Sequence, residues 1–216
     1  MLSSLRYFRD LEHCGNDWIG DRLEGSSEVR FPEPYVLTEN SPELHQVNHM
    51  HATMGHTGKF ADVISTGQII IRSQITYQIP DCHIFSFCSG DLEALRSAMQ
   101  GATDPYTACL RIKSPMQLFQ DMLQLGQIPD LERPAAEVFK NAALDRICYE
   151  SLSADISDSN FTPPSPFKKP VRFQAQQEHR LVLEAPPNFG DPLPDRIVVQ
   201  IPNLQNHFEI VLLPNR

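Results

Sequence analysis

The sequence predicts an α+β fold in a single domain that covers residues 1–216. Candidate strands come first, helices occupy the middle and strands return at the end, and this segregation is typical of α+β rather than alternating βαβ folds. A chain of 216 residues can bury a full hydrophobic core, and a division into two domains stays open. Apolar content of 41% and charged content of 21% are ordinary for a globular protein.

Charge and cysteine usage exclude several classes of protein. The formal net charge of -9 argues against a broad nucleic-acid or anionic-membrane surface, although a local basic groove stays compatible with it. No apolar run reaches the roughly 20 residues of a membrane span, and no signal-peptide pattern follows Met1, so no membrane partner is expected. The 5 cysteines form no Cys-x-x-Cys pair and predict reduced thiols in a cytoplasmic protein.

The first half of the chain is expected to be mainly strand and loop. Leu5-Arg6-Tyr7-Phe8 predicts a short strand or the start of a buried element, and residues 16–25 predict a polar loop. Residues 31–60 are rich in proline and histidine without periodicity, which predicts a long irregular segment. The β-branched residues 67–77 predict one strand or two, and the apolar residues 83–90 predict another.

Helices are expected in the middle of the chain. Asp91 is suited to cap a helix that continues to about Gln100, because its carboxylate accepts hydrogen bonds from free backbone N–H groups. Ser114-Pro115 predicts the start of a second helix, and residues 133–141 a third. The apolar stripe of the second helix is expected to contain Met116, Phe119, Met122 and Leu123.

The remaining strands are predicted on both sides of a long loop. Residues 109–113 predict a strand between two helices, and the polar, proline-rich residues 151–170 predict a loop. Three further strands are expected in residues 171–184, 196–201 and 207–213, because proline-containing turns separate them.

The segment Phe173–Arg180 carries the most function-like pattern. If it is a strand, alternation places Gln174, Gln176, Glu178 and Arg180 on one face. A face with one carboxylate, two amides and one guanidinium is either a solvated surface or one wall of a polar cleft. Periodicity alone does not decide between these two interpretations.

Gln176-x-Glu178 resembles the Gln-x-Glu element of ADP-ribosyltransferases. Those enzymes have a split, mainly antiparallel β-sheet core and carry an early arginine, a middle-strand serine and a late glutamate. This sequence offers Arg6, then Ser86 or Ser89, then Glu178 in the same order. The middle strand lacks the Ser-Thr-Ser setting, so either serine could fill that position.

The chain is also similar over residues 5–183 to a group of uncharacterised bacterial and phage proteins. The shared features are an early Leu-Arg-aromatic strand, an acidic turn, a middle strand that ends Cys-aromatic-Ser or similar, and a late strand. In this sequence the acidic turn is Gly20-Asp21-Arg22-Leu23-Glu24-Gly25, and the late strand covers Lys169 to Arg180.

The resemblance implies a mono-ADP-ribosyltransferase that uses NAD as substrate, of the kind found among toxins, effectors and phage or bacterial conflict factors. Glu178 would be the catalytic carboxylate and Gln176 its partner, which orients the nucleophile. The acceptor is an unidentified macromolecule or small molecule, and a cognate antitoxin or a host protein is a candidate partner. The residues that the resemblance implies for NAD binding are Arg6, Tyr7, Ser86 and Ser89.

Two alternatives stay open at this point. The chain could be an NAD glycohydrolase without an acceptor, or a non-catalytic interaction module that binds a protein through its acidic surface and the histidine-rich segment. His45, His49, His51 and His56 have spacings compatible with a metal, but no His-Glu-x-x-His pattern supports one and no metal is predicted. Cys88 near His83 is expected to be a buried strand thiol rather than a nucleophile.

Overall fold

The fold is α+β with mainly antiparallel sheets, which confirms the predicted class. The computed structural model describes residues 1–13, 21–31, 35–38, 40–53, 69–71, 74–98, 108–156, 162–186, 189–190 and 192–213. The chain divides into two compact units. The first unit contains Met1–Glu24, Asp81–Ile147 and Arg172–Arg216, and the second contains Gly25–Pro80 and Cys148–Val171.

A five-stranded antiparallel sheet forms the centre of the first unit. Its strands, in spatial order, are β10 (Asn141–Arg146), β14 (Glu178–Glu184), β6 (His83–Cys88), β1 (Leu2–Ser4) and β15 (Arg196–Ile197). In the register between the two central strands, Glu178 lies opposite Cys88 and Leu183 lies opposite His83. This register places the start of β14 beside the end of β6.

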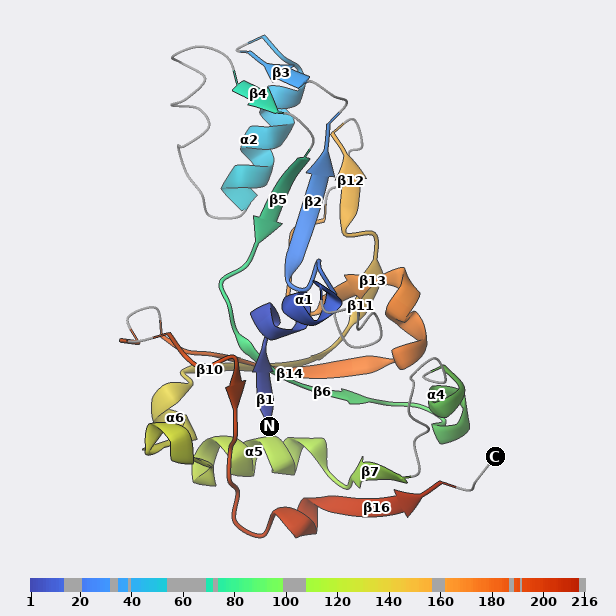
Figure 1. The fold of residues 1–216 in the computed structure, drawn as a ribbon, viewed down its shortest axis with the longest axis vertical. Helices are drawn as coiled ribbons and strands as arrows, with labels where there is room; N and C mark the ends of the chain where they lie inside the picture. Colours follow the sequence, from blue (N-terminus) through green and yellow to red (C-terminus); the bar gives the residue numbers. More distant parts are fainter. Residues whose placement is uncertain are drawn as a thin grey trace. The chain divides into compact units, whose positions relative to one another are not determined.

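Helices lie on both sides of this sheet. In Figure 1, α5 (Pro115–Leu125) lies on the opposite side of β6 and β14 from α1 (Leu5–His13). A two-stranded antiparallel ribbon of β7 and β16 lies on the α5 side. The other bounds in this unit are α4 (Leu92–Ala98), β7 (Ala108–Ile112), β8 (Gln127–Ile128), η1 (Pro129–Leu131), β9 (Arg133–Pro134), α6 (Ala135–Val138), η2 (Val171–Gln176), η3 (Leu204–His207) and β16 (Phe208–Leu212).

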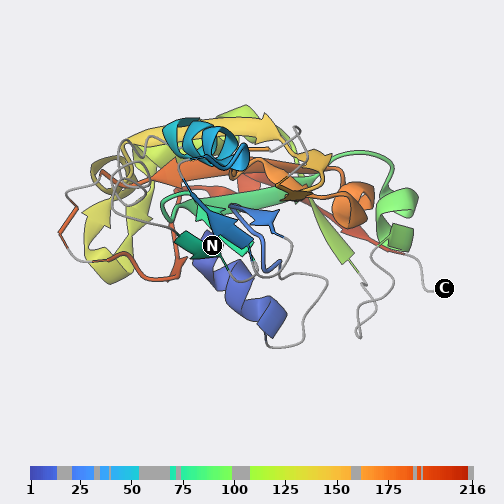
Figure 2. The same ribbon diagram turned by 90° about the horizontal axis from the view of Figure 1, so that it is seen from above.

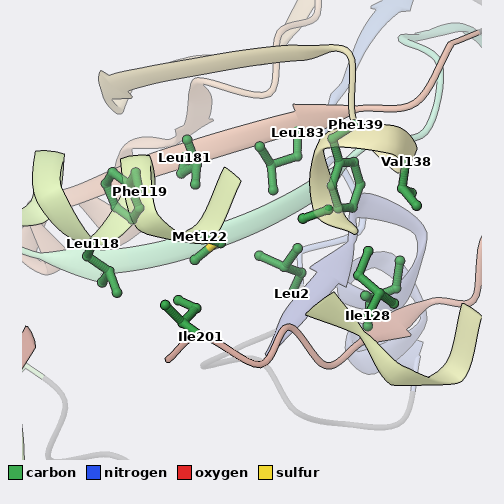
Figure 3. Packing of buried hydrophobic residues seen from close by; sticks show 12 residues of the cluster. Leu2, Leu118, Phe119, Met122, Ile128, Val138, Phe139, Leu181, Leu183 and Ile201 are labelled. Carbon is green, nitrogen blue, oxygen red and sulfur yellow. The ribbon is translucent and has the colours of Figure 1, made fainter. Parts of the chain in front are cut away.

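The main hydrophobic core lies between α5 and one face of the sheet. Phe119 and Met122 of α5 lie near Leu181 of β14, as Figure 3 shows. The Phe119 ring lies 5.9 Å from the ring of Phe85 and 5.8 Å from the ring of Phe87. Because side chains alternate along a strand, Leu181 faces this core while Arg180 points to the other side of the sheet.

The local sequence determines where helix α5 begins and which of its side chains are buried. The Ser114 hydroxyl accepts a hydrogen bond from the Gln117 N–H, and Pro115 occupies the first turn, as the sequence predicted. Leu118, Phe119 and Met122 are buried. Met116 is 58% exposed, so its expected place in the apolar stripe was wrong.

The second unit has its own sheet and core. Strands β12 (Ser153–Asp155), β2 (Ser26–Arg30) and β5 (Gln74–Gln78) form a three-stranded sheet in that order. Its other elements are β3 (Tyr35–Leu37) paired with β4 (Ile69–Ile71), α2 (Glu43–Thr53), and β11 (Cys148–Glu150) paired with β13 (Lys168–Pro170). The core residues are Val29, Phe31, Leu37, Val47, Ile71, Tyr77 and Ile156.

Several predicted elements are confirmed. Residues 67–77 contribute β4 and most of β5, and residues 83–90 contain β6. Strand β7 and strand β16 match residues 109–113 and 207–213 closely. The Asp91 carboxylate accepts a hydrogen bond from the Ala94 N–H at 2.9 Å and so caps α4.

Other predictions were wrong where tertiary pairing or a helix overrides the local pattern. The early strand is Leu2–Ser4, and a helix begins at Leu5 instead. Residues 31–60 were expected to be irregular, yet they contain β3 and α2. The expected loop 151–170 includes β12 and β13, and each of these pairs with a strand distant in sequence.

We predict that Phe119→Ala lowers the free energy of unfolding by about 3–5 kcal/mol, because it removes a buried ring from the centre of the core. Met116→Ala on the same helix is the matched control and should change the free energy of unfolding by about 0.5 kcal/mol or less. Urea unfolding of both variants measures the difference. Equal losses of unfolding free energy in the two variants would show that the face of α5 assigned to the core is wrong.

Candidate functional site

A buried ion-pair cluster lies on the face of the five-stranded sheet that points away from α5. The Arg180 side chain on β14 is 1% exposed. Its Nε donates a hydrogen bond to Oε1 of Glu178 at 2.5 Å, and its Nη1 donates to Oε1 of Glu24. Glu24 and Glu178 are buried as well. One guanidinium therefore joins two carboxylates that are far apart in sequence.

The acidic turn brings Glu24 to the sheet. The Glu24 N–H donates to the carbonyl oxygen of Asp21 at 2.9 Å, and the Arg9 guanidinium of α1 donates to the Glu24 carbonyl oxygen at 2.8 Å. Gly25 follows with φ +64°, a left-handed conformation that costs glycine little. The turn is therefore held by backbone contacts, and the Glu24 side chain reaches Arg180.

A second ion pair ties the same turn to the segment before β14. The Arg172 guanidinium of η2 lies 3.6 Å from the carboxylate of Asp21. Asp21 is buried, whereas the Arg172 side chain is half-exposed. Both acidic residues of the turn therefore contact arginines of the segment 171–180.

The cluster carries a net negative formal charge, because one guanidinium faces two carboxylates. Burial by itself lowers the pKa of the Arg180 guanidinium, but the charges of Glu24 and Glu178 more than offset this, and the net pKa lies above its ordinary value. Among the residues that the structure describes, Oε2 of Glu24 has no hydrogen-bond partner. Removing Arg180 would leave two buried carboxylates side by side, which is strongly unfavourable.

Ser86 on β6 completes the arrangement around Glu178. Its hydroxyl donates a hydrogen bond to Oε1 of Glu178 at 2.7 Å. Ser89 lies just beyond the strand, where its N–H donates to the carbonyl oxygen of Gln177 at 3.1 Å. Ser86 is exposed while Glu178 is buried, so the serine is the more accessible member of the pair.

Gln176 does not share a strand face with Glu178. It is the last residue of η2, and β14 begins only at Glu178. Gln177 between them has φ 45°, a left-handed conformation that reorients the chain. The predicted continuous strand through Phe173–Arg180 is therefore wrong before Glu178, whereas the shared face of Glu178 and Arg180 is confirmed by their hydrogen bond.

Arg6 and Tyr7 lie on α1 rather than on a strand. The Arg6 guanidinium pairs with Asp195 at 2.6 Å and is half-exposed, and the Arg196 guanidinium lies 5.4 Å from the Tyr7 ring centre. Arg6 follows β1 next to the start of β6, whereas Glu178 lies beside the end of β6, about 17 Å away along the strand. The structure thus unites Ser86 with Glu178 but does not place Arg6 or Tyr7 beside them.

Sequence reasoning placed Arg180 on one face with Glu178 but missed Glu24 as the second partner of Arg180. Both residues stand in segments that the sequence singles out, Glu24 in the acidic turn and Arg180 in the late strand. The spacing within each motif gives no sign that the two motifs contact each other, because Glu24 and Arg180 are 156 positions apart.

The structure does not bring the other polar candidates together among the residues that it describes. His83 and Cys88 lie at opposite ends of β6, and Nε2 of His83 is 2.7 Å from the Pro194 carbonyl oxygen. Cys88 is exposed, not buried as expected. His45, His49 and His51 lie on α2, and His56 lies outside the described residues. Within the described ranges, no group of three or more His, Cys, Asp or Glu residues could hold a metal ion.

Comparison with protein-family models, curated proteins and solved structures finds no match for this chain. No helix in the described part of the chain is long and apolar enough to cross a membrane.

We predict that Arg180→Met lowers the free energy of unfolding by about 3–5 kcal/mol, because it leaves two buried carboxylates without their cation. Arg6→Met removes an exposed ion pair and is the matched control, with an expected loss of about 1 kcal/mol or less. Chemical unfolding of both variants at neutral pH measures these losses. Equal stability of the two variants would contradict the buried cluster.

Proposed function

We propose that the chain is an NAD-dependent ADP-ribosyltransferase in which Glu178 is the catalytic carboxylate. The observation that carries the proposal is the 2.7 Å hydrogen bond from Ser86 to Glu178 between neighbouring antiparallel strands. A middle-strand serine next to a late-strand glutamate is the pair that the resemblance to ADP-ribosyltransferases implies.

The chemistry requires a fixed negative charge near the ribose of NAD. When the bond between nicotinamide and ribose breaks, its electron pair goes to the nicotinamide nitrogen and positive charge develops on the ribose. A carboxylate already in place stabilises that charge more in the transition state than in the bound substrate. The nucleophile of the acceptor then bonds to the ribose carbon and releases its proton, and water in its place gives NAD hydrolysis.

The cluster gives Glu178 the fixed position that such a role needs. Arg180 and Ser86 both donate to Oε1 of Glu178, so the carboxylate is held from two sides. Because Ser86 is exposed, the substrate would approach the pair from the Ser86 side. Arg6 lies at the other end of β6, so its predicted role as an NAD anchor needs a separate test.

The Arg180 pairing favours a second function class. It engages the carboxylate that catalysis needs, and Glu178 is only 4% exposed. In a non-catalytic interaction module the same cluster would only fix the acidic turn against β14, and the acidic surface would bind a protein partner. These two functions differ in whether NAD is consumed.

We predict that the purified chain releases nicotinamide from NAD and that Glu178→Gln lowers this rate about 100-fold or more. This variant should stay folded, because Glu24 still neutralises Arg180. Glu184→Gln, an exposed carboxylate at the other end of β14, is the matched control and should keep the wild-type rate. Ser86→Ala should lower the rate about tenfold, since a hydrogen bond to a charged group contributes about 1.5 kcal/mol.

NAD labelled in the adenylate phosphate, incubated with cell extract, separates transfer from hydrolysis. Label on a macromolecule supports the transferase, and nicotinamide release without label transfer supports the glycohydrolase. The Arg6→Ala variant, assayed in parallel, tests the predicted role of Arg6 in binding NAD. If Arg6 has this role, the variant binds NAD more weakly than the wild type. If the wild-type chain neither binds nor consumes NAD, the NAD-dependent enzyme is the wrong class.

A further inference from the structure

The residue directly before Glu178 has a left-handed backbone. Gln177, the single residue between η2 and β14, has φ 45°. Glycine, asparagine and aspartate adopt this region most readily, and a β-branched residue is strongly disfavoured there. The conformation of Gln177 sets the direction in which the chain enters β14, and therefore the side of the sheet on which the Glu178 side chain lies.

Hydrogen bonds hold the Gln177 backbone on both sides of its Cα atom. Its N–H donates to the carbonyl oxygen of Gln174 at 3.2 Å, and its own carbonyl oxygen accepts a hydrogen bond from the Ser89 N–H at 3.1 Å. The Ser89 hydroxyl donates to the same oxygen at 3.4 Å. The peptide group that joins Gln177 to Glu178 is therefore tied to the residue that follows β6, one position beyond the Glu178–Cys88 pair.

Gly90 makes room for the Gln177 side chain. Gly90 has φ +121°, and a Cβ atom at this position would lie 2.7 Å from Oε1 of Gln177. The amide end of Gln177 therefore lies directly against the bare Cα atom of Gly90. In both ribbon views η2, the orange coil before Gln177, and α4, which follows Gly90, lie at the same end of the sheet (Figures 1 and 2). Ser89 and Gly90 thus contact both the main chain and the side chain of Gln177.

We propose that Gln177 is a positioning residue for the Glu178 carboxylate. Arg180 and Ser86 hold the Glu178 side chain at its carboxylate end, and Gln177, anchored to Ser89, fixes the backbone at the other end. This role rests on the proposed function of Glu178. It gives a defined task to the residue that the Gln-x-Glu pattern leaves unspecified.

The position of a catalytic carboxylate matters to the rate more than to substrate binding. A displacement of about 1 Å can lower the rate of an enzyme about 100-fold. Because the carboxylate stabilises charge that develops only in the transition state, its displacement lowers kcat and leaves the KM for NAD nearly unchanged. A change at Gln177 should therefore separate these two constants.

The test exchanges Gln177 for two residues with opposite backbone preferences. Gln177→Gly keeps the left-handed conformation accessible, so kcat for nicotinamide release should stay within about threefold of the wild type. Gln177→Val disfavours that conformation and should lower kcat at least about tenfold, with the KM for NAD within about twofold. Gln174→Val is the matched control and should keep the wild-type rate, because this exposed residue of η2 bonds Gln177 through its carbonyl oxygen and not its side chain.

A second measurement does not involve NAD. The Arg180 Nε–H donates to Oε1 of Glu178, so its NMR signal reports the position of that carboxylate. The signal should shift in Gln177→Val and stay at the wild-type frequency in Gln177→Gly and Gln174→Val. If the wild-type chain does not consume NAD, the proposed function is wrong, and the NMR signal alone decides whether Gln177 positions Glu178.

Gly90→Ala approaches the same turn from β6 and covers the case in which Gln177→Val does not fold. Its added Cβ atom pushes against the Gln177 side chain, so it should give the same loss of kcat and a shifted Arg180 signal. Two results would overturn the proposal. Folded Gln177→Val or Gly90→Ala with the wild-type kcat and an unshifted signal would show that the turn does not position Glu178. A tenfold loss in Gln177→Gly would show that the Gln177 side chain acts on the substrate directly.

Discussion

The pairing of Arg180 with Glu24 and Glu178 is the interaction on which the first unit depends. A guanidinium that is 1% exposed is tolerated only when its charge and its donors are satisfied. Two carboxylates from distant parts of the chain meet this need. The acidic turn must consequently lie against β14, and α1, whose Arg9 bonds the Glu24 carbonyl oxygen, must lie on the same side of the sheet.

The same constraint positions the carboxylate of the proposed catalytic site. It fixes the Glu178 carboxylate beside Ser86 on one side of β6, where charge and hydrogen bonds can act on a polar substrate. The alternate residues Phe85 and Phe87 point to the other side, where they pack against the core beside α5. One strand therefore separates a polar environment from the apolar core.

Local sequence patterns predicted the elements that neighbouring residues determine. The cap of α5 at Ser114 and strand β6 follow from neighbouring residues. The Glu24–Arg180 contact joins positions 156 apart, and no periodicity reports such a contact. Gln176 was expected on one strand face with Glu178, but the left-handed Gln177 separates η2 from the strand. Arg6 was expected on a strand, but helix α1 begins at Leu5. The order of motifs offered Ser86 or Ser89 together with Glu178 but did not indicate the Ser86–Glu178 hydrogen bond or the Glu24–Arg180 ion pair.

The double-mutant cycle of Glu24→Gln and Glu178→Gln tests most directly whether the two carboxylates jointly hold Arg180. Each single variant leaves one of these two carboxylates on the guanidinium, while the double variant removes both. The two losses in unfolding free energy should therefore be non-additive, with the double variant about 1–3 kcal/mol less stable than their sum. Additivity within about 0.5 kcal/mol would contradict the shared cluster.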